Sequence, residues 1–275
     1  MEVPLSHAET RATVTLMDVR LDNLSEAEVI GQIVRNASRG EGGWMVNPNV
    51  DVMRQIVESA GLRKLVAGAD LVVPDGMPLL WAGRLQADPF KQRVPVSELI
   101  GPLCAEATKF AVGVFLLGGS PGSAERAAAV LAARNPGLAV DYMCPPSGFE
   151  RSEEAMAEIH RALQDSAPGV VFCAFGFPKQ ERLMEGLSER FPSMWFLGSG
   201  GTFSMVAGDT PKAPVWMRKS GLEWLHRLRL EPRRLFARYI VHDFPFALRL
   251  LFSSARARFS RGDLPSAVDE QGGSR

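Results

Sequence analysis

The sequence contains few cysteines and no long apolar run. Its three cysteines, Cys104, Cys144 and Cys173, are odd in number and far apart, which argues against a disulfide framework or a zinc site and favours a reducing compartment. No apolar stretch reaches the ~18–20 residues that span a bilayer, and the polar segment Met1–Thr13 lacks the apolar core of a signal peptide. We therefore expect a cytoplasmic protein.

Motifs of several other protein classes are missing as well. Without a Walker A sequence, a P-loop phosphotransferase is not expected. The chain has no Asp-x-Asp pair, and its four histidines are dispersed and form no cluster with the cysteines. A structural or catalytic transition metal is therefore not expected, and neither is a nucleic-acid partner.

The charges balance overall but are unevenly distributed. The chain has 31 basic and 31 acidic residues, yet between Arg218 and Arg261 eleven lysines and arginines face three acidic residues. Tryptophan, leucine and phenylalanine recur among these arginines at near-helical spacing. A helix with one basic and one apolar face suits the surface of an anionic membrane. The alternative is a helical hairpin that packs on the body of the protein and exposes its arginines to solvent.

The rest of the chain alternates between short apolar runs and amphipathic segments. Strands are expected over 12–19, 43–46, 69–73, 112–117, 138–142, 170–175 and 194–197, with helices between them. This alternation predicts an α/β fold with a Rossmann-like, mostly parallel and doubly wound sheet. We place this domain at 12–212, a basic, helical, membrane-associating appendage at 213–260, and a disordered tail at 261–275.

One stretch combines a buried strand with a polar helix start. After an apolar run, Gly176 ends the strand, and Pro178 has the fixed φ that suits the first position of a helix. Lys179, Gln180 and Glu181 then fall in the first helical turn, at the edge of the sheet where α/β proteins bind ligands. They could contact a polar ligand or belong to an ordinary solvated helix start.

Asp75 also follows an apolar strand. It lies between Pro74 and Gly76, which favour a sharp turn. A carboxylate at the end of a strand is well placed to accept a proton from a hydroxyl nucleophile, although an aspartate before a glycine often only stabilises its own turn. Asn47 and Asn49 follow another strand, where they could bond ligand hydroxyls or cap the next helix.

A glycine-rich loop follows the strand over 112–117. Its sequence, Gly118-Gly119-Ser120-Pro121-Gly122, invites comparison with the dinucleotide-binding fingerprint G-x-G-x-x-G. That fingerprint needs a glycine where this chain has Ser120, and Pro121 removes an amide that could bind phosphate. A NAD-dependent oxidoreductase is therefore an alternative that rests on a weak match.

Six blocks of sequence, taken in order, form a recognisable family pattern. They are Asn47-Pro48-Asn49-Val50-Asp51, Pro74-Asp75-Gly76, Phe115-Leu116-Leu117-Gly118-Gly119, Pro145-Pro146-Ser147-Gly148-Phe149, Gly176-Phe177-Pro178-Lys179-Gln180-Glu181 and Gly198-Ser199-Gly200-Gly201-Thr202-Phe203. The basic segment adds Ala213-Pro214, Leu222-Glu223-Trp224, Arg227-Leu228, Glu231-Pro232 and Arg238-Tyr239. Together, over about residues 15–245, they resemble the WecG/TagA/CpsF glycosyltransferases, and most of all the GumM-like exopolysaccharide branch.

The resemblance implies an inverting, metal-independent transfer of a sugar from a UDP-sugar to a polyprenyl-diphosphate-linked sugar. Such transfer occurs during cell-surface or exopolysaccharide biosynthesis, so the protein would be peripheral on the inner face of the plasma membrane. No cofactor is implied, because the UDP-sugar is the donor substrate. Another UDP-sugar-modifying enzyme with a Rossmann-like site is a further alternative, and exposed apolar faces on the appendage would allow a homo-oligomer.

The same resemblance assigns roles to individual residues. Asp75 is the expected base, and Asn47 and Arg93 complete the candidate catalytic group. The donor and its nucleotide are expected to contact a larger set, namely Asn49, Gly118, Gly119, Lys179, Gln180, Glu181 and Gly200. Appendage arginines are expected to reach the diphosphate or the membrane, namely Arg227, Arg234 and Arg238.

The chain departs from the family pattern at three positions. Asn47 stands where many members have threonine, so a role that requires a hydroxyl is not carried over. In the segment Arg93–Leu99, Val96 replaces a glycine and Glu98 replaces an aspartate. We therefore expect the backbone of this segment to differ from that of other members.

Overall fold

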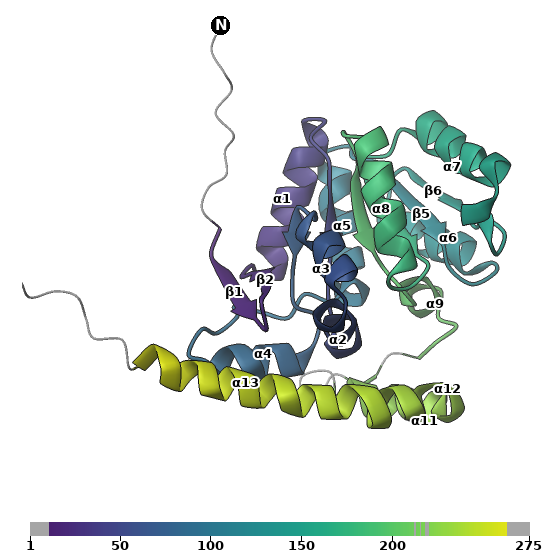
Figure 1. The fold of residues 1–275 in the computed structure, drawn as a ribbon. Coiled ribbons are helices and arrows are strands. Elements are labelled where there is room, and N and C mark those ends of the chain that lie inside the picture. Colours follow the sequence, from purple (N-terminus) through teal and green to yellow (C-terminus); the bar gives the residue numbers. More distant parts are fainter. Residues whose placement is uncertain (1–10, 212, 215, 218–219, 263–275) are drawn as a thin grey trace, which may run out of the picture.

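A computed structural model describes residues 11–211, 213–214, 216–217 and 220–262 of the chain. For Arg234 and for residues 260–262 it describes the backbone alone. Figure 1 shows an α/β body with a long helix along one end of it.

The chain begins with a short antiparallel hairpin of β1 (Thr13–Leu16) and β2 (Val19–Asp22). The single strand expected over 12–19 is therefore wrong in its second half. Met17 and Asp18 have φ values of +47° and +63°, and two such residues form the tight turn whose twist matches a two-stranded hairpin.

The main sheet has six parallel strands, in the order β4-β3-β8-β7-β5-β6. They are β3 (Gly43–Val46), β4 (Leu71–Val72), β5 (Val114–Gly118), β6 (Val140–Met143), β7 (Val170–Ala174) and β8 (Trp195–Gly198). Every residue of β3, β5, β7 and β8 is buried, because helices cover both faces of the sheet. The predicted parallel, doubly wound sheet is confirmed.

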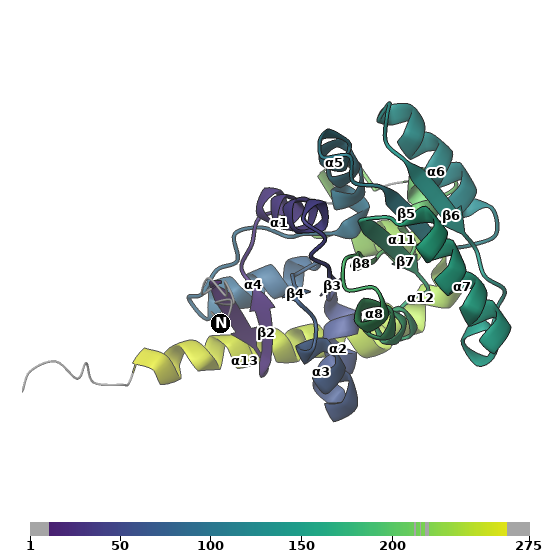
Figure 2. The same cartoon turned by 90° about the horizontal axis from the view of Figure 1, so that it is seen from above.

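Two layers of helices enclose this sheet, as the view from above shows (Figure 2). One layer contains α1 (Glu26–Ser38), α5 (Val96–Lys109) and α6 (Ser123–Arg134), and the other α2 (Val50–Glu58), α3 (Ala60–Ala67), α7 (Glu153–Ser166) and α8 (Lys179–Arg190). Successive strand residues point to opposite faces. Phe115 therefore belongs to one hydrophobic core, and its neighbour Leu116 to the other.

The helix starts differ in how they are capped. Ser25-Glu26-Ala27-Glu28 has the sequence of a capping box, and Ser25 caps α1 with Glu28 as its partner. Ser97 has the residue type of a helix cap, but α5 already begins at Val96 after Pro95. Pro178, expected at the first position of a helix, precedes α8 instead of opening it. Two further helices are α4 (Met77–Leu85) and α9 (Thr202–Val206).

The C-terminal segment is helical, as predicted. It contains α11 (Glu223–Leu230), α12 (Pro232–Phe236), the π-helix η2 (Ala237–Asp243) and α13 (Phe244–Gly262), which we call the appendage. Helix α13 packs against α4, and η2 packs against α2. Phe246 and Leu250 of α13 are buried, and so is Leu235 of α12.

The ends of the predicted domains are only partly covered. Residues 261 and 262 of the expected tail form the end of α13, and the rest of that tail lies outside the described residues. The boundary at 212/213 stays a prediction. Within the described ranges, no helix combines the length and the hydropathy that crossing a bilayer requires.

Candidate active site

A cavity of about 920 Å³ opens at the carboxyl edge of the sheet. Its walls are the segments that follow β3, β4, β5, β7 and β8, together with part of the appendage. Parallel strands end at the same edge, so residues far apart in the sequence meet there. Ten of the predicted site residues line the cavity, namely Asn47, Asn49, Asp75, Gly119, Lys179, Gln180, Glu181, Gly200, Arg227 and Arg238.

The other three predicted residues lie differently. Gly118 is the last residue of β5, directly before Gly119. Arg93 is one contact away from the cavity, because the two carboxylates that it pairs with belong to the cavity wall. Arg234 is part of α12, but its side chain lies outside the described residues.

Asp75 and Asn47 link the ends of two neighbouring strands. The N–H of Asp75, after β4, donates to the carbonyl of Pro48 at 3.0 Å. Asn47, after β3, donates from Nδ2 to Asp75 Oδ2 at 3.4 Å. Asn47 thus orients the carboxylate, and an amide can do this without the hydroxyl of the threonine found in other members.

Asp75 is half-buried in the cavity, and its proton affinity is unusually high. Burial raises the pKa of this carboxyl to about 7. Arg93 and Arg227 act against the rise, whereas Glu223 and Glu98 add to it. A carboxyl with this pKa is roughly half ionised at neutral pH, which is the condition that general base catalysis favours.

Arg93 is held between two carboxylates. Its Nη2 donates to Glu98 Oε1 at 3.0 Å, and its Nη1 donates to Glu223 Oε2 at 3.2 Å. Glu98, one of the departures from the family pattern, is thus a direct partner of this arginine. Val96, at the position of the family's glycine, is the buried first residue of α5.

The side chains of Gln180 and Glu181 are engaged inside the protein. Gln180 Oε1 accepts the N–H of Gly176 at 3.0 Å, and its Nε2 donates to Glu181 Oε1 at 3.0 Å. Glu181 is 2% exposed, and burial raises the pKa of its carboxyl to about 7. Its Oε2 has no hydrogen-bond partner among the described residues. Gln180 therefore supports the loop after β7, a role that the sequence did not indicate.

Lys179 holds a second loop against the start of α8. Its Nζ pairs with Glu150 at 2.7 Å and lies 4.4 Å from the ring centroid of Phe149. The Phe149 ring in turn contacts Phe175, with centroids 4.7 Å apart. Because Phe149, Phe175 and Lys179 all line the cavity, this cluster gives the cavity one aromatic wall.

Two predicted ligand contacts have clear structural roles. Asn49 caps α2, since its side chain accepts the N–H of Val52 at 3.1 Å. Gly119 has a φ of +87°, and a Cβ atom there would lie 2.6 Å from Ser123 Oγ. Only glycine fits this position, which brings the backbone after β5 into the cavity wall.

Two appendage arginines face the body across the cavity. Arg227 pairs with Glu223 on its own helix at 3.4 Å, and Arg238 pairs with Asp51 of α2 at 2.9 Å. Their side chains are 41% and 39% exposed, so both are partly open to the cavity that they line. Arginine suits a diphosphate because its planar fork binds phosphate oxygens in pairs and keeps its charge.

Arg238 also belongs to an ion-pair cluster that sequence analysis missed. Arg54 of α2 pairs with Asp51 at 2.8 Å, and both Arg54 and Arg238 approach Asp243 of η2, at 3.7 and 3.8 Å. Burial raises the pKa of Asp243 to about 6. We call these four residues the α2–η2 cluster. Asp51 and Arg238 both belong to the family blocks, but nothing in the sequence indicated that they pair with each other.

One thiol lies in the wall of the same cavity. Cys144 is exposed and donates from Sγ to the carbonyl of Gly119 at 3.7 Å. The other two cysteines, Cys104 and Cys173, are buried in the hydrophobic cores.

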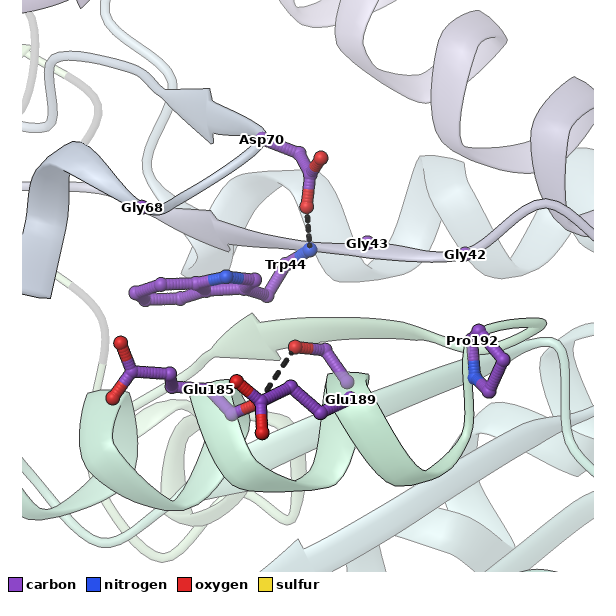
Figure 3. A pocket seen from close by; sticks show the side chains of 9 residues that line it. Gly42, Gly43, Trp44, Gly68, Asp70, Glu185, Glu189 and Pro192 are labelled. Atoms are coloured by element: carbon purple, nitrogen blue, oxygen red, sulfur yellow. Dashed lines mark hydrogen bonds between the residues drawn. The ribbon is translucent and has the colours of Figure 1, made fainter.

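A smaller depression of about 400 Å³ lies near the amino ends of β3 and β4 (Figure 3). There the Asp70 carboxylate accepts the N–H of Trp44 at 2.9 Å, with Glu185 and Glu189 of α8 nearby. These negative side chains would repel a diphosphate. Across the described ranges, no three His, Cys, Asp or Glu side chains are grouped so that they could hold a metal ion.

The fold and the cavity together define a class of protein. The parallel sheet has a polar cavity at its carboxyl edge, and a carboxyl with a raised pKa and two arginines line it. This arrangement fits an enzyme that acts on an anionic ligand. Residues 14–260 match the model of the Glycosyl transferase WecG/TagA/CpsF family, and the chain belongs to this family. It is therefore a glycosyltransferase of cell-surface polymer biosynthesis. This decides against the oxidoreductase alternative.

Proposed function

We propose that the protein transfers a sugar from a UDP-sugar to a polyprenyl-diphosphate-linked sugar, with inversion and without a metal or cofactor. The family implies a sugar-nucleotide donor and a lipid-linked acceptor as the kinds of partner. One observation supports the finer proposal. The cavity is lined by Asp75, whose carboxyl has a raised pKa, and by two partly exposed arginines, Arg227 and Arg238.

Asp75 is the base in this proposal. Its carboxylate takes the proton of an acceptor hydroxyl while the oxygen of that hydroxyl attacks the anomeric carbon of the donor sugar. The bond from that carbon to the diphosphate breaks, and UDP leaves with the bonding electrons. Attack from the side opposite the leaving group inverts the anomeric centre. Asn47 orients the base through its hydrogen bond to Oδ2.

Arg227 and Arg238 stabilise the charge that develops on the leaving diphosphate. Both belong to the appendage and line the cavity, and fixed positive charge at the leaving group is an effective form of catalysis. Arg234 would join them according to the family pattern. Gly119 and Gly200 would allow backbone amides to approach the nucleotide, and the cavity volume of about 920 Å³ is of the size that small-molecule ligands occupy.

The appendage would bring this site to the inner face of the plasma membrane. It carries most of the exposed large apolar side chains of the described chain, including Phe236, Phe244, Phe252 and Phe259, and basic residues accompany them. Apolar and basic groups on one segment favour an anionic membrane. A lipid-linked acceptor and an exopolysaccharide product, as in the GumM-like branch, fit this location.

The decisive experiment measures UDP release from a panel of UDP-sugars, with and without a polyprenyl-diphosphate-sugar acceptor in detergent. We expect release that depends on the acceptor with one donor, and we expect it to persist after treatment with EDTA. The anomeric configuration of the product, determined by NMR, tests inversion.

Other outcomes would change the proposal. Turnover of a UDP-sugar without any acceptor would favour another sugar-nucleotide-modifying enzyme. If no UDP-sugar bound, the donor would have to carry another nucleotide. Loss of activity in EDTA with recovery on adding Mg²⁺ would contradict a metal-independent reaction.

A further inference from the structure

We propose that Glu223 of the appendage is a positioning residue for the base Asp75, because it pairs with Arg93 at the wall of the cavity that Asp75 also lines. The proposal deepens the transferase function proposed above and rests on it for its meaning in turnover. The ion pair itself is a feature of the unliganded protein, so part of the test is independent of the donor.

The geometry gives Arg93 two carboxylate partners from different parts of the fold. Glu98 belongs to α5 of the body, and Glu223 belongs to α11 of the appendage, 130 residues away from Arg93 in the sequence. The Arg93 side chain is 14% exposed, so solvent screens these pairs weakly. Each terminal nitrogen of Arg93 is thereby directed to a glutamate.

This arrangement matters because both glutamates that pair with Arg93 line the same cavity as Asp75, and the charge of Arg93 lowers the pKa of the Asp75 carboxyl. Among the side chains that the structure describes, four charged groups act on the Asp75 carboxyl, namely Arg93, Arg227, Glu98 and Glu223, in addition to the hydrogen bond from Asn47. Two of them are positive and two are negative, so their effects offset one another. Without the glutamates, Arg93 would favour the ionised form of Asp75 and make it a weaker base.

Glu223 has a second consequence because of the segment to which it belongs. It pairs with Arg93 through Oε2 and with Arg227 through Oε1. The same side chain therefore joins an arginine of the body to an arginine proposed for the diphosphate. The charge around the base and the position of α11 then depend on one residue.

The α2–η2 cluster offers a matched control. Asp243 also links appendage and body through arginines, at 3.7 Å to Arg54 and 3.8 Å to Arg238, yet it is not among the groups that act on Asp75. A variant of Asp243 changes the contact between appendage and body without removing a charge from the groups that act on Asp75.

The test compares Glu223→Gln, Glu98→Gln and Asp243→Asn with the wild-type protein. The pH dependence of kcat/KM gives the apparent pKa of the base, and ¹³C NMR of the aspartate carboxyls follows Asp75 directly in the unliganded protein, with Asp75→Asn to assign its signal.

We expect both glutamine variants to move this pKa from about 7 toward about 6, because removing one nearby charge changes proton affinity about tenfold. Glutamine can still accept a hydrogen bond from Arg93, so α11 should stay docked. Asp243→Asn should leave the pKa of Asp75 unchanged.

Two results would overturn the proposal. An unchanged Asp75 titration in Glu223→Gln would show that the ion pair does not tune the base. An equal shift in Asp243→Asn would show that docking, and not the charge of Glu223, matters. If Glu223→Gln loses its fold, Glu98→Gln tests the same charge effect from within the body. If the wild-type protein transfers no sugar, the proposed function fails, but the NMR titration still decides the inference.

Discussion

Asp75 makes the folded protein sensitive to pH at the scale of one residue. Its ordinary pKa is 3.8, and burial raises it to about 7 in the folded state. Between these values the native protein holds a proton that the unfolded chain has released. The free energy of unfolding therefore falls as the pH rises through this range, and the loss is complete above about pH 7.

Replacing Asp75 should separate stability from activity. At pH 8 we expect Asp75→Asn to increase the free energy of unfolding by roughly 1–3 kcal/mol, since each tenfold difference in proton affinity corresponds to about 1.4 kcal/mol. At pH 4 the substitution should have little effect on the free energy of unfolding.

Turnover of Asp75→Asn should fall by ~10²–10⁴-fold, the range for a positioned base, with donor binding little changed. Urea denaturation at both pH values measures the first effect, and Asp165→Asn on the exposed surface of α7 is the control. Equal stabilisation at both pH values, or near wild-type turnover, would contradict this role.

At the scale of elements, the contact between the end of β8 and the start of α8 requires a residue without a side chain, Gly198. A Cβ atom at Gly198, the last residue of β8, would meet the side-chain nitrogen of Gln180 and the carboxylate of Glu181. The Gln180 side chain holds the N–H of Gly176 after β7. Gly198 thus makes room for the two polar side chains that fix the loop beside the cavity.

Gly198→Ala should therefore disturb this junction. We expect a loss of about 1–3 kcal/mol in the free energy of unfolding, because the inserted methyl displaces packed and hydrogen-bonded groups. Weaker donor binding should accompany it, measured by calorimetry with UDP. Gly186→Ala in α8 is a matched control, since nothing lies within 4 Å of its added Cβ, and it should stabilise the helix by up to about 1 kcal/mol. A neutral Gly198→Ala would remove the packing argument.

The sequence was informative about elements and less so about their contacts. Apolar runs identified the strands of the sheet because strands buried on both faces are continuously apolar. The family blocks brought Asp75, Gln180 and the glycine loop to one edge. They did not reveal that Glu223 pairs with Arg93, because ion pairs between distant segments leave no periodic trace in one sequence. The role of Gln180 inside the loop was missed for another reason, because a polar residue in a first helical turn can face either a ligand or its own loop.

At the scale of the whole molecule, the appendage exposes apolar side chains along its length. Phe252 and Phe259 of α13 are each 74% exposed, whereas Leu250 on the same helix is fully buried. The buried side docks α13 on the body, and the exposed side is available to a membrane. A single helix therefore has two apolar sides, one packed on the body and one exposed.

The exposed side should bind anionic vesicles. We expect the double variant with Phe252→Ser and Phe259→Ser to bind phosphatidylglycerol vesicles at least about tenfold more weakly, because each ring contributes roughly 1.5–3 kcal/mol when buried. Its thermal stability should not change. Sedimentation with vesicles measures binding, and added salt should weaken it in both proteins. Phe110→Ser is the control, since that ring is 45% exposed but follows α5 of the body. Unchanged binding of the double variant would place the membrane contact elsewhere.

Of the three thiols, the one in the cavity wall can be used to detect a bound ligand. Burial raises the pKa of Cys104 to about 12 and also raises that of Cys173, so both are unreactive, while Cys144 is exposed in the cavity wall. A thiol-reactive fluorophore should attach at Cys144 alone, without any engineering of the chain. Slower labelling in the presence of a candidate donor would then report occupancy of the cavity, and donors could be ranked before any acceptor has been prepared.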